Sequence, residues 1–179
     1  MPFFASTESP LGTLLMVSDG RALAGVYFVG QKYQAQPAPD WHEDPELPVL
    51  KRARVQLHEY FAGRRHEFDL PLSPAGTQFQ QRVWRALRSI PYGVTRSYGA
   101  LAQSIGAPRS VRAVGAAIGR NPISIVIPCH RVVGGDGSLT GYAGGLARKQ
   151  ALLDLETAQV RNRRGGSRTT ETGFSTAQT

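Results

Sequence analysis

The sequence contains a single cysteine, Cys129, and lacks any long hydrophobic run. One cysteine excludes an intramolecular disulfide and any zinc or iron–sulfur site built from several cysteines. Because disulfides are typical of oxidising compartments, we expect a reducing, cytoplasmic location. The apolar runs fall far short of the roughly 20 residues that cross a bilayer, and the first ten residues, MPFFASTESP, carry no basic stretch. We therefore expect neither a membrane span nor a signal peptide.

Acidic residues are scarce in one part of the chain. Residues 1–75 carry 7 Lys+Arg against 9 Asp+Glu, residues 76–156 carry 10 against 3, and residues 157–179 carry 4 against 1. Nine of the ten cations in the middle segment are arginines, whose planar side chains suit phosphates and base edges. This one-sided excess favours a polyanionic partner, although a solvated basic face without a partner has the same composition.

The first part of the chain has the pattern of strands followed by a helix. Two apolar runs, 14–17 and 23–29, are separated by a turn containing Asp-Gly, which predicts a β-hairpin. Residues 31–47 are polar and read as a loop. A helix is predicted between Pro48 and Gly63, with Leu50, Ala53, Leu57, Tyr60 and Phe61 on one apolar stripe. The proline-bearing stretch 69–76 then reads as an interdomain connection.

From residue 77 onward the pattern is mostly helical. Thr77, Ser97 and Ser110 are each placed to cap a helix, and Gly106 and Gly119 are placed to end the two short ones. Two short helices joined by a tight turn form a helix-turn-helix pattern, which occurs both in DNA-binding proteins and in plain helical cores. A last helix is predicted over 146–156, and the polar tail 158–179 is predicted to be disordered.

The lone cysteine lies in IPCHRVVGGDG, between Pro128 and His130 and after the apolar run 123–127. A lone cysteine is commonly a small buried side chain. Here the neighbouring imidazole can lower the pKa of the thiol and act as a base, and the basic segment favours the thiolate. The glycines that follow suggest open space in front of the sulfur. Cys129 is therefore a candidate nucleophile, although these features name no substrate.

The line from Ser97 to Glu156 resembles the O6-alkylguanine-DNA alkyltransferases, also called methylated-DNA–protein-cysteine methyltransferases. The motifs RAVG, RNP, PCHRV and GYAGGL stand in the family's order. The resemblance is strong from residue 77 to 156 and weaker over 1–75. It implies an α+β fold: a small N-terminal α/β, ribonuclease H-like domain with a mostly antiparallel sheet (1–75), and a mostly helical winged helix-turn-helix DNA-binding domain (76–157).

The resemblance also implies DNA repair by direct reversal of damage. Such a protein flips O6-alkylguanine, and we expect also O4-alkylthymine, out of duplex DNA and transfers the alkyl group irreversibly to its cysteine, here Cys129. His130 would take the thiol proton through a water molecule, and Glu156 would orient the imidazole. Asn121 would brace the active-site turn, and Tyr142 would assist the departing guanine oxygen. Read without the family, His130 is a structural histidine, Glu156 a solvated charge and Asn121 an ordinary turn residue.

The implied partner is double-stranded DNA that contains O6-alkylguanine, bound through the minor groove. Arg112 would fill the space that the flipped base leaves, and Tyr98 would push the neighbouring phosphate aside. Taken singly, Arg112 reads as a solvated arginine and Tyr98 as a core aromatic. The second helix, with Ser110 at its start, carries small residues that would allow a close approach to the groove: Ala113, Gly115 and Ala117.

The base itself would be held by the segments on either side of the glycine loop. The backbone of Val132 and Val133 would contact the base edge, while Gly144 and Gly145 would belong, with Tyr142, to a loop that closes over it. We interpret Arg131 as structural. The sequence does not indicate which alkyl groups are preferred.

The sequence also bears on whether the protein binds a metal and on which other functions are compatible with it. Some members hold zinc in the N-terminal domain, but residues 1–75 contain no cysteine and only three histidines, so we expect no metal and no cofactor. A non-catalytic lesion-binding protein would lack the acceptor cysteine. A plain helix-turn-helix regulator would not need Cys129, His130 and Glu156 together, and a cysteine hydrolase would turn over repeatedly. We expect a monomer, and the sequence leaves open whether copies cooperate along DNA.

The tail 158–179 matches no motif of the family, and we expect its arginines to add only non-specific attraction to DNA. Deleting residues 158–179 should therefore leave the rate of alkyl transfer from duplex DNA unchanged at moderate salt. Loss of transfer in this truncated chain would contradict that role for the tail.

Overall fold

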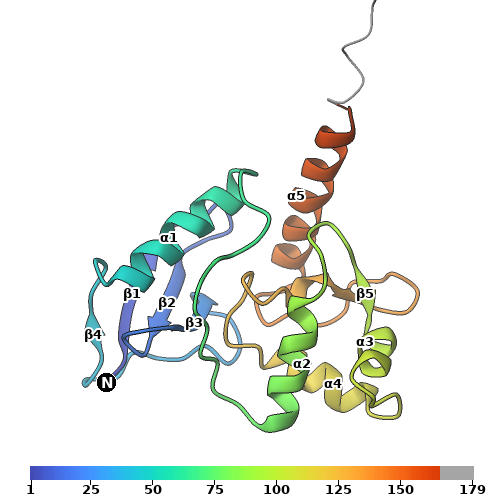
Figure 1. Ribbon diagram of the computed structural model, residues 1–179, viewed down its shortest axis with the longest axis horizontal. Helices are drawn as coiled ribbons and strands as arrows, with labels where there is room; N and C mark the ends of the chain where they lie inside the picture. The colour runs from blue at the N-terminus through green and yellow to red at the C-terminus, as the bar shows by residue number, and fades with distance from the viewer. Residues whose placement is uncertain (166–179) are drawn as a thin grey trace, which may run out of the picture.

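The computed structural model describes residues 1–165, which form two parts that lie side by side (Figure 1). The strands are β1 (Phe3–Thr7), β2 (Leu14–Ser18), β3 (Leu23–Phe28), β4 (His42–Glu43), β5 (Arg96–Ser97) and β6 (Val132–Val133). The α-helices are α1 (Pro48–Phe61), α2 (Gln78–Arg88), α3 (Tyr98–Ser104), α4 (Val111–Gly119) and α5 (Leu146–Gly165), and a short 3₁₀ helix, η1, spans Cys129–Arg131.

The N-terminal part is a four-stranded sheet with α1 packed on it (Figure 1). The strand order is β3-β2-β1-β4, in which only the β1–β4 pair is parallel. The predicted hairpin is confirmed, with Leu14 opposite Phe28 across β2 and β3. The sequence did not predict β1, and β4 lies inside the predicted loop. Both depend on pairing with a distant partner, which local pattern does not reveal.

Helix α1 begins at Pro48, as predicted, because proline suits a first turn that needs no backbone donor. Its predicted stripe faces the sheet, and Leu50, Leu57 and Tyr60 have no exposed surface. Burying side chains of this size contributes roughly 1.5–3 kcal/mol each, so this face fixes α1 on the sheet.

The C-terminal part is built on the predicted helix caps. Thr77 and Gln80 form a capping box at the start of α2, and the Ser97 hydroxyl accepts a hydrogen bond from the Ala100 amide in α3. Ser110 stands at the start of α4, but its side chain makes no capping hydrogen bond there. The prediction of its position is confirmed, whereas its predicted capping hydrogen bond is not formed.

Helix α5 is longer than predicted. It continues past Glu156 to Gly165, and the prediction of disorder is wrong for residues 158–165, while residues 166–179 lie outside the described part of the chain. The added turns pack on the rest of the protein, since Gln159 lies against Gly63 and Val160 against Gly93. A truncation confined to the tail therefore begins at residue 166.

The two parts are joined along the edge of the sheet. The Val26 amide of β3 donates to the Pro122 carbonyl at 2.9 Å, and the Ser124 amide donates to the Val26 carbonyl at 2.9 Å. This parallel bridge attaches the segment before Cys129 to the sheet edge as a short extra strand. The position of Cys129 therefore depends on the N-terminal part as well as on its own.

Within residues 1–165, no helix combines the length and apolar character that crossing a membrane requires. The same residues contain no cluster of three or more His, Cys, Asp or Glu side chains suited to hold a metal ion.

Candidate active site and nucleic-acid interface

Cys129 begins η1, and Pro128 separates it from the apolar segment 123–127. This segment is buried and irregular: Ile125 has a φ of 73°, in the left-handed region that side chains avoid. The side chain of Asn121 supplies hydrogen bonds to backbone groups of this segment that a regular helix or strand would otherwise satisfy. Its Oδ1 accepts from the Ile123 amide at 3.0 Å, and its Nδ2 donates to the Ile127 carbonyl at 2.8 Å. The predicted brace is thus present in the geometry of the turn.

The Cys129 side chain is covered, with 6% of its surface exposed, so the predicted open space in front of the sulfur is absent. Burial raises the pKa of the Cys129 thiol, because a thiolate loses its hydration there. Hydrogen bonding by Asn121 and the positive charge of Lys149 lower the pKa but do not outweigh burial. The expectation of a thiol acidified by its surroundings was therefore wrong in direction. Cys129 needs a base to become a thiolate.

The carboxylate of Glu156 is the centre of the site and has no exposed surface. Its Oε1 accepts from Tyr60 Oη at 2.8 Å, His130 Nε2 at 2.7 Å and Arg131 Nη2 at 2.9 Å. Its Oε2 accepts from the Gly93 amide at 3.0 Å and Arg131 Nε at 3.0 Å. Burial alone would raise the pKa of Glu156, but the hydrogen bonds and charges of His130 and Arg131 lower it to about 2. Glu156 is therefore an anion at neutral pH.

The contact with Glu156 fixes the tautomer of His130. An anionic carboxylate can only accept, so Nε2 carries the proton and Nδ1 keeps its lone pair. Nδ1 is buried and has no hydrogen-bond partner among residues 1–165. Burial lowers the pKa of His130, although Glu156 opposes this. The ring is therefore neutral at rest, and its acceptor nitrogen belongs to the residue that directly follows Cys129 in the chain.

Two residues of this network were missed or underrated by the sequence reading. Tyr60 was predicted only as a core residue of α1, yet it hydrogen-bonds Glu156, 96 residues further along the chain. Arg131 was interpreted as structural, and it pairs with Glu156 while Nη1 donates to the Ile90 carbonyl at 2.7 Å. Neither Tyr60, in the middle of a helix, nor Arg131, within the cysteine motif, carries a sequence signal that distinguishes such contacts from ordinary packing.

Lys149 was also missed. Its side chain is buried, and Nζ donates to the carbonyls of Thr140 at 2.9 Å and Gly141 at 3.3 Å. Tyr98 Oη donates to the same Thr140 carbonyl at 2.7 Å. Lys149 and Tyr98 thus hold the glycine-rich loop from two sides. A buried lysine between a half-buried Arg148 and an exposed Gln150 could not be recognised from sequence alone.

The glycine-rich loop places Tyr142 over the site. The Tyr142 hydroxyl is buried and makes no hydrogen bond to the described residues, and burial, with the nearby Cys129, raises its pKa well above the usual range. Gly144 packs between the Tyr142 ring and Phe28, where a side chain would collide with both. Gly145 has a φ of 89°, which favours glycine.

Val132 and Val133 form β6, which pairs in parallel with β5, so this strand pair stands beside the helices as a wing. Both valine side chains are buried, and any contact they make with a ligand is therefore through the backbone.

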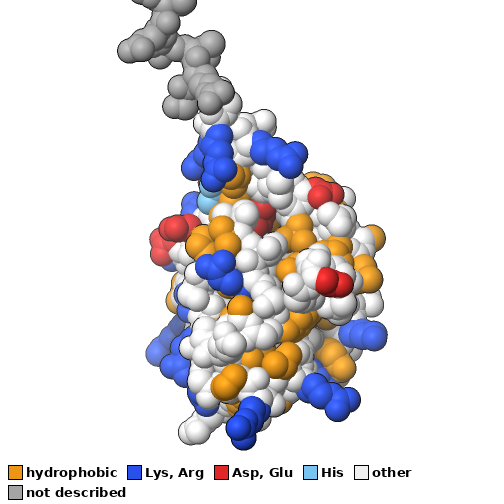
Figure 2. Space-filling view, turned by 90° about the vertical axis from the view of Figure 1, so that its right-hand side faces the viewer, with side chains coloured by type: hydrophobic (Ala, Val, Ile, Leu, Met, Phe, Trp, Pro, Cys, Tyr) orange, Lys and Arg blue, Asp and Glu red, His pale blue; other side chains and the backbone are white. Residues whose placement is uncertain are grey.

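The helix-turn-helix presents α4 with one exposed face. Arg112 and Ala113 are exposed, and Gly115 lies against the Tyr98 ring of α3. Ala117 does not fit the predicted use: it is 3% exposed, and its carbonyl accepts from Trp84 Nε1 of α2 at 2.8 Å. It packs inward because α2 covers that side of α4. Figure 2 shows Lys and Arg side chains at both ends of the molecule on this face, including the C-terminal end of α5, with the Asp and Glu side chains between them.

Comparisons with known proteins were made for the whole chain. The family model described as 6-O-methylguanine DNA methyltransferase, ribonuclease-like domain, matches residues 3–74, and that described as its DNA binding domain matches residues 78–158. A methylated-DNA–protein-cysteine methyltransferase of Haemophilus influenzae is 48% identical over 155 residues, covering 86% of each chain. One of Methanosarcina acetivorans is 48% identical over 86% of this chain and 97% of its own.

Solved structures give the same relationship. The Mycobacterium tuberculosis OGT in complex with DNA is 48% identical and superimposes with a TM-score of 0.81, covering 88% of this chain and 94% of its own. An O6-methylguanine-DNA methyltransferase of the archaeon Pyrococcus kodakaraensis is 26% identical with a TM-score of 0.58, covering 87% of this chain and 99% of its own.

The network around Glu156 predicts a large loss of stability when its charge is removed. In Glu156→Gln the NH2 group of the new amide faces groups that are themselves hydrogen-bond donors, and Arg131 loses the anion with which it pairs. We expect the free energy of unfolding to fall by about 3–5 kcal/mol in urea titrations near pH 7. Asp154→Asn, two residues earlier on α5 and exposed, is the control and should stay within about 0.5 kcal/mol.

The pH dependence of stability should also differ between the wild type and Glu156→Gln. The pKa of about 2 is below the ordinary 4.5, so the contribution of the carboxylate is complete above 4.5 and is lost as the pH falls toward 2. Glu156→Gln should lack this part of the acid destabilisation. A variant as stable as the wild type, with the same acid profile, would show that the network does not stabilise the fold.

Proposed function

The chain belongs to the family of methylated-DNA–protein-cysteine methyltransferases, and on this premise we propose that Cys129 is the residue that accepts the alkyl group. The family's reaction is DNA repair by alkyl transfer to a cysteine of the protein itself. The observation that carries the assignment is the Cys129–His130–Glu156 arrangement, in which a buried anion holds the neutral imidazole of the residue that follows the only cysteine in the chain. Each molecule acts once, because the thioether product leaves no free thiol.

We place the substrate in double-stranded DNA as O6-alkylguanine, with O4-alkylthymine as a second substrate. The protein acts as a monomer, in the cytoplasm, where its thiol stays reduced. The N-terminal domain spans 1–75 and the DNA-binding domain 76–157. A base inside a duplex cannot reach a buried sulfur, so the nucleotide must leave the stack. Because Cys129 is 6% exposed and Tyr142 lies near it, we expect the loop that carries Tyr142, Gly144 and Gly145 to move when the base enters.

The reaction is an in-line displacement. His130 Nδ1 takes the Cys129 proton, directly or through one water, and the imidazolium that forms is stabilised by Glu156. The sulfur lone pair then forms a bond to the alkyl carbon as the bond between that carbon and O6 breaks. The electron pair of that bond passes to the guanine base, which takes up one proton, equivalent to the one that Cys129 gave to His130, and remains in the DNA as unmodified guanine.

The remaining site residues position the base and the turn. The unpartnered hydroxyl of Tyr142 is suited to donate a hydrogen bond to O6 as negative charge develops there. Asn121 holds the turn that carries Cys129, and the backbone of Val132 contacts the base edge. None of these steps requires a metal or a cofactor.

The DNA contacts come from α3 and α4. Arg112 enters the space that the base leaves, Tyr98 turns the neighbouring phosphate, and the small Ala113 and Gly115 let α4 approach the minor groove. The free hydroxyl of Ser110 at the start of α4 is suited to a phosphate. A non-catalytic lesion-binding protein is the alternative. Such a protein would need neither the thiol of Cys129 nor a neutral imidazole at His130, so the presence of both argues against it.

The base role of His130 predicts a change in the pH profile. His130→Ala should lower the rate with the free base O6-benzylguanine at pH 7 by about 100-fold or more, because the thiol pKa is raised and its base is gone. The variant's rate should then rise about tenfold per pH unit toward the thiol pKa. The wild type should lose rate only on the acid side, where His130 becomes protonated.

Rapid-quench measurement of benzyl transfer from pH 5 to 10 tests this. His58→Ala, an exposed histidine on α1, is the control and should keep the wild-type profile. An unchanged rate and profile in His130→Ala would remove His130 from the reaction.

The proposed function itself is tested by weighing the intact protein after mixing it with duplex DNA that carries one O6-methylguanine. The mass should rise by one methyl group and no further, and Cys129→Ser should show no gain. Tight binding to the lesion without a change in mass would favour the non-catalytic alternative. No change and no preference for the lesion would leave only a DNA-binding protein.

A further inference from the structure

Tyr33 is an exposed aromatic residue held in an unfavourable backbone conformation. It is 58% exposed, and its φ of 58° lies in the left-handed region that bulky side chains avoid. Such backbone strain costs conformational free energy, and it persists only where the contacts of neighbouring residues hold the backbone in place. It is found most often at functional sites. No demand of the core explains it, because the Tyr33 ring is not part of the core.

The loop around Tyr33 is braced on both sides. The Lys32 amide donates to the Ala143 carbonyl of the active-site loop at 3.2 Å, and the Gly30 amide donates to Gln34 Oε1 at 2.6 Å. The buried Gln31 side chain accepts from the Phe28 amide at 2.8 Å. The strained backbone is therefore fixed, and it is fixed next to the loop that carries Tyr142.

The ring of Tyr33 supports an arginine from the other domain. The guanidinium carbon of Arg120 lies 3.8 Å from the ring centroid, and Arg120 stands at the C-terminal end of α4, directly before Asn121. Among residues 1–165 no carboxylate forms an ion pair with Arg120. Its guanidinium is therefore oriented by a ring and retains its charge for an external anion.

Arg120 continues the exposed face of α4. Arg112, Ala116 and Arg120 follow one another at intervals of four residues, which places them on one side of the helix. Eight residues of helix span about 12 Å, which exceeds the width of about 6 Å of a minor groove. When Arg112 enters the base stack, Arg120 at the other end of α4 therefore lies beyond the groove, at the border where the phosphates stand.

We propose that Tyr33 and Arg120 form a phosphate clamp at the C-terminal end of α4, in which Arg120 contacts a DNA phosphate and Tyr33 is its positioning residue. The N-terminal domain thereby contributes to DNA binding, next to the active-site loop. This inference rests on the proposed function, because it takes duplex DNA as the partner of α4.

The test compares Arg120→Ala, Tyr33→Ala and Tyr33→Phe by fluorescence titration of a duplex carrying one O6-methylguanine, between 50 and 200 mM salt. Arg120→Ala should weaken binding several-fold and reduce the slope of log affinity against log salt by about 1. Tyr33→Ala should weaken binding and reduce the slope by less, and Tyr33→Phe, which keeps the ring, should restore both.

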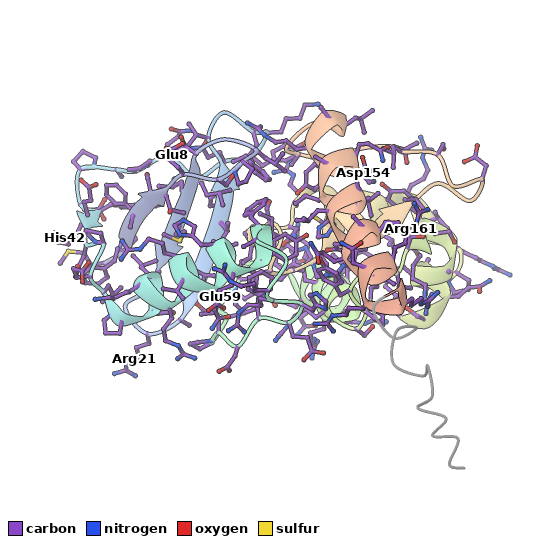
Figure 3. All side chains as sticks on the ribbon, turned by 90° about the horizontal axis from the view of Figure 1, so that it is seen from above. Glu8, Arg21, His42, Glu59, Asp154 and Arg161 are labelled. Carbon is purple, nitrogen blue, oxygen red and sulfur yellow. The ribbon has the colours of Figure 1, made fainter. Side chains whose placement is uncertain are left out.

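Two controls separate a DNA contact from damage to the fold. Arg21→Ala removes an exposed arginine in the turn between β2 and β3, on the side of the molecule away from α5 (Figure 3), and should leave the slope unchanged. Benzyl transfer from free O6-benzylguanine should be unchanged in all four variants, because that reaction needs no phosphate contact.

An Arg120→Ala variant with wild-type affinity and slope would overturn the clamp. So would a Tyr33→Phe variant as defective as Tyr33→Ala, since a ring without its hydroxyl still supports Arg120. Failure of the wild-type protein to accept a methyl group would instead overturn the proposed function, and the binding data would still report on the clamp.

Discussion

A carboxylate with no exposed surface must find its hydrogen bonds inside the protein, and Glu156 accepts six of them. The donors come from α1, from η1 and from the turn at Gly93, while Glu156 itself belongs to α5. An unpaired buried charge would cost several kcal/mol, so these elements are constrained to meet at one point. The two domains, the position of α5 and the orientation of His130 all follow from that requirement.

The same burial governs the reactivity of the site. It raises the pKa of the Cys129 thiol and lowers that of the His130 imidazole, so both groups are neutral at rest. Separating charge between them is favoured only when Glu156 stabilises the imidazolium and a substrate receives the sulfur lone pair. A thiolate–imidazolium pair already present at rest would separate charge even without a substrate. In the neutral pair, with the tautomer of His130 fixed, charge separates only during the reaction, when Glu156 stabilises it.

Sequence reasoning found what local pattern and motif determine. The Asp-Gly hairpin, the helix starting at Pro48 and the helix cap at Thr77 each depend on residues a few positions apart. The motifs identified the family, and with it Cys129, His130 and Glu156. Residues whose partners are remote were not accessible: β1 needs β2, Tyr60 needs Glu156, and Ala117 faces α2 for a reason visible only when α2 is in place. The reversed direction of the thiol pKa has the same origin, because burial depends on the whole fold.

The covered sulfur has a consequence for the lifetime of the molecule before it meets damage. Peroxides oxidise thiolates at accessible sites, first to sulfenic acid and then irreversibly. Cys129 is protonated at rest and 6% exposed, which makes it a poor target. The chain has no second cysteine that could trap a sulfenic acid as an intramolecular disulfide. For a protein with one thiol to use once, shielding that thiol keeps the stored molecules competent.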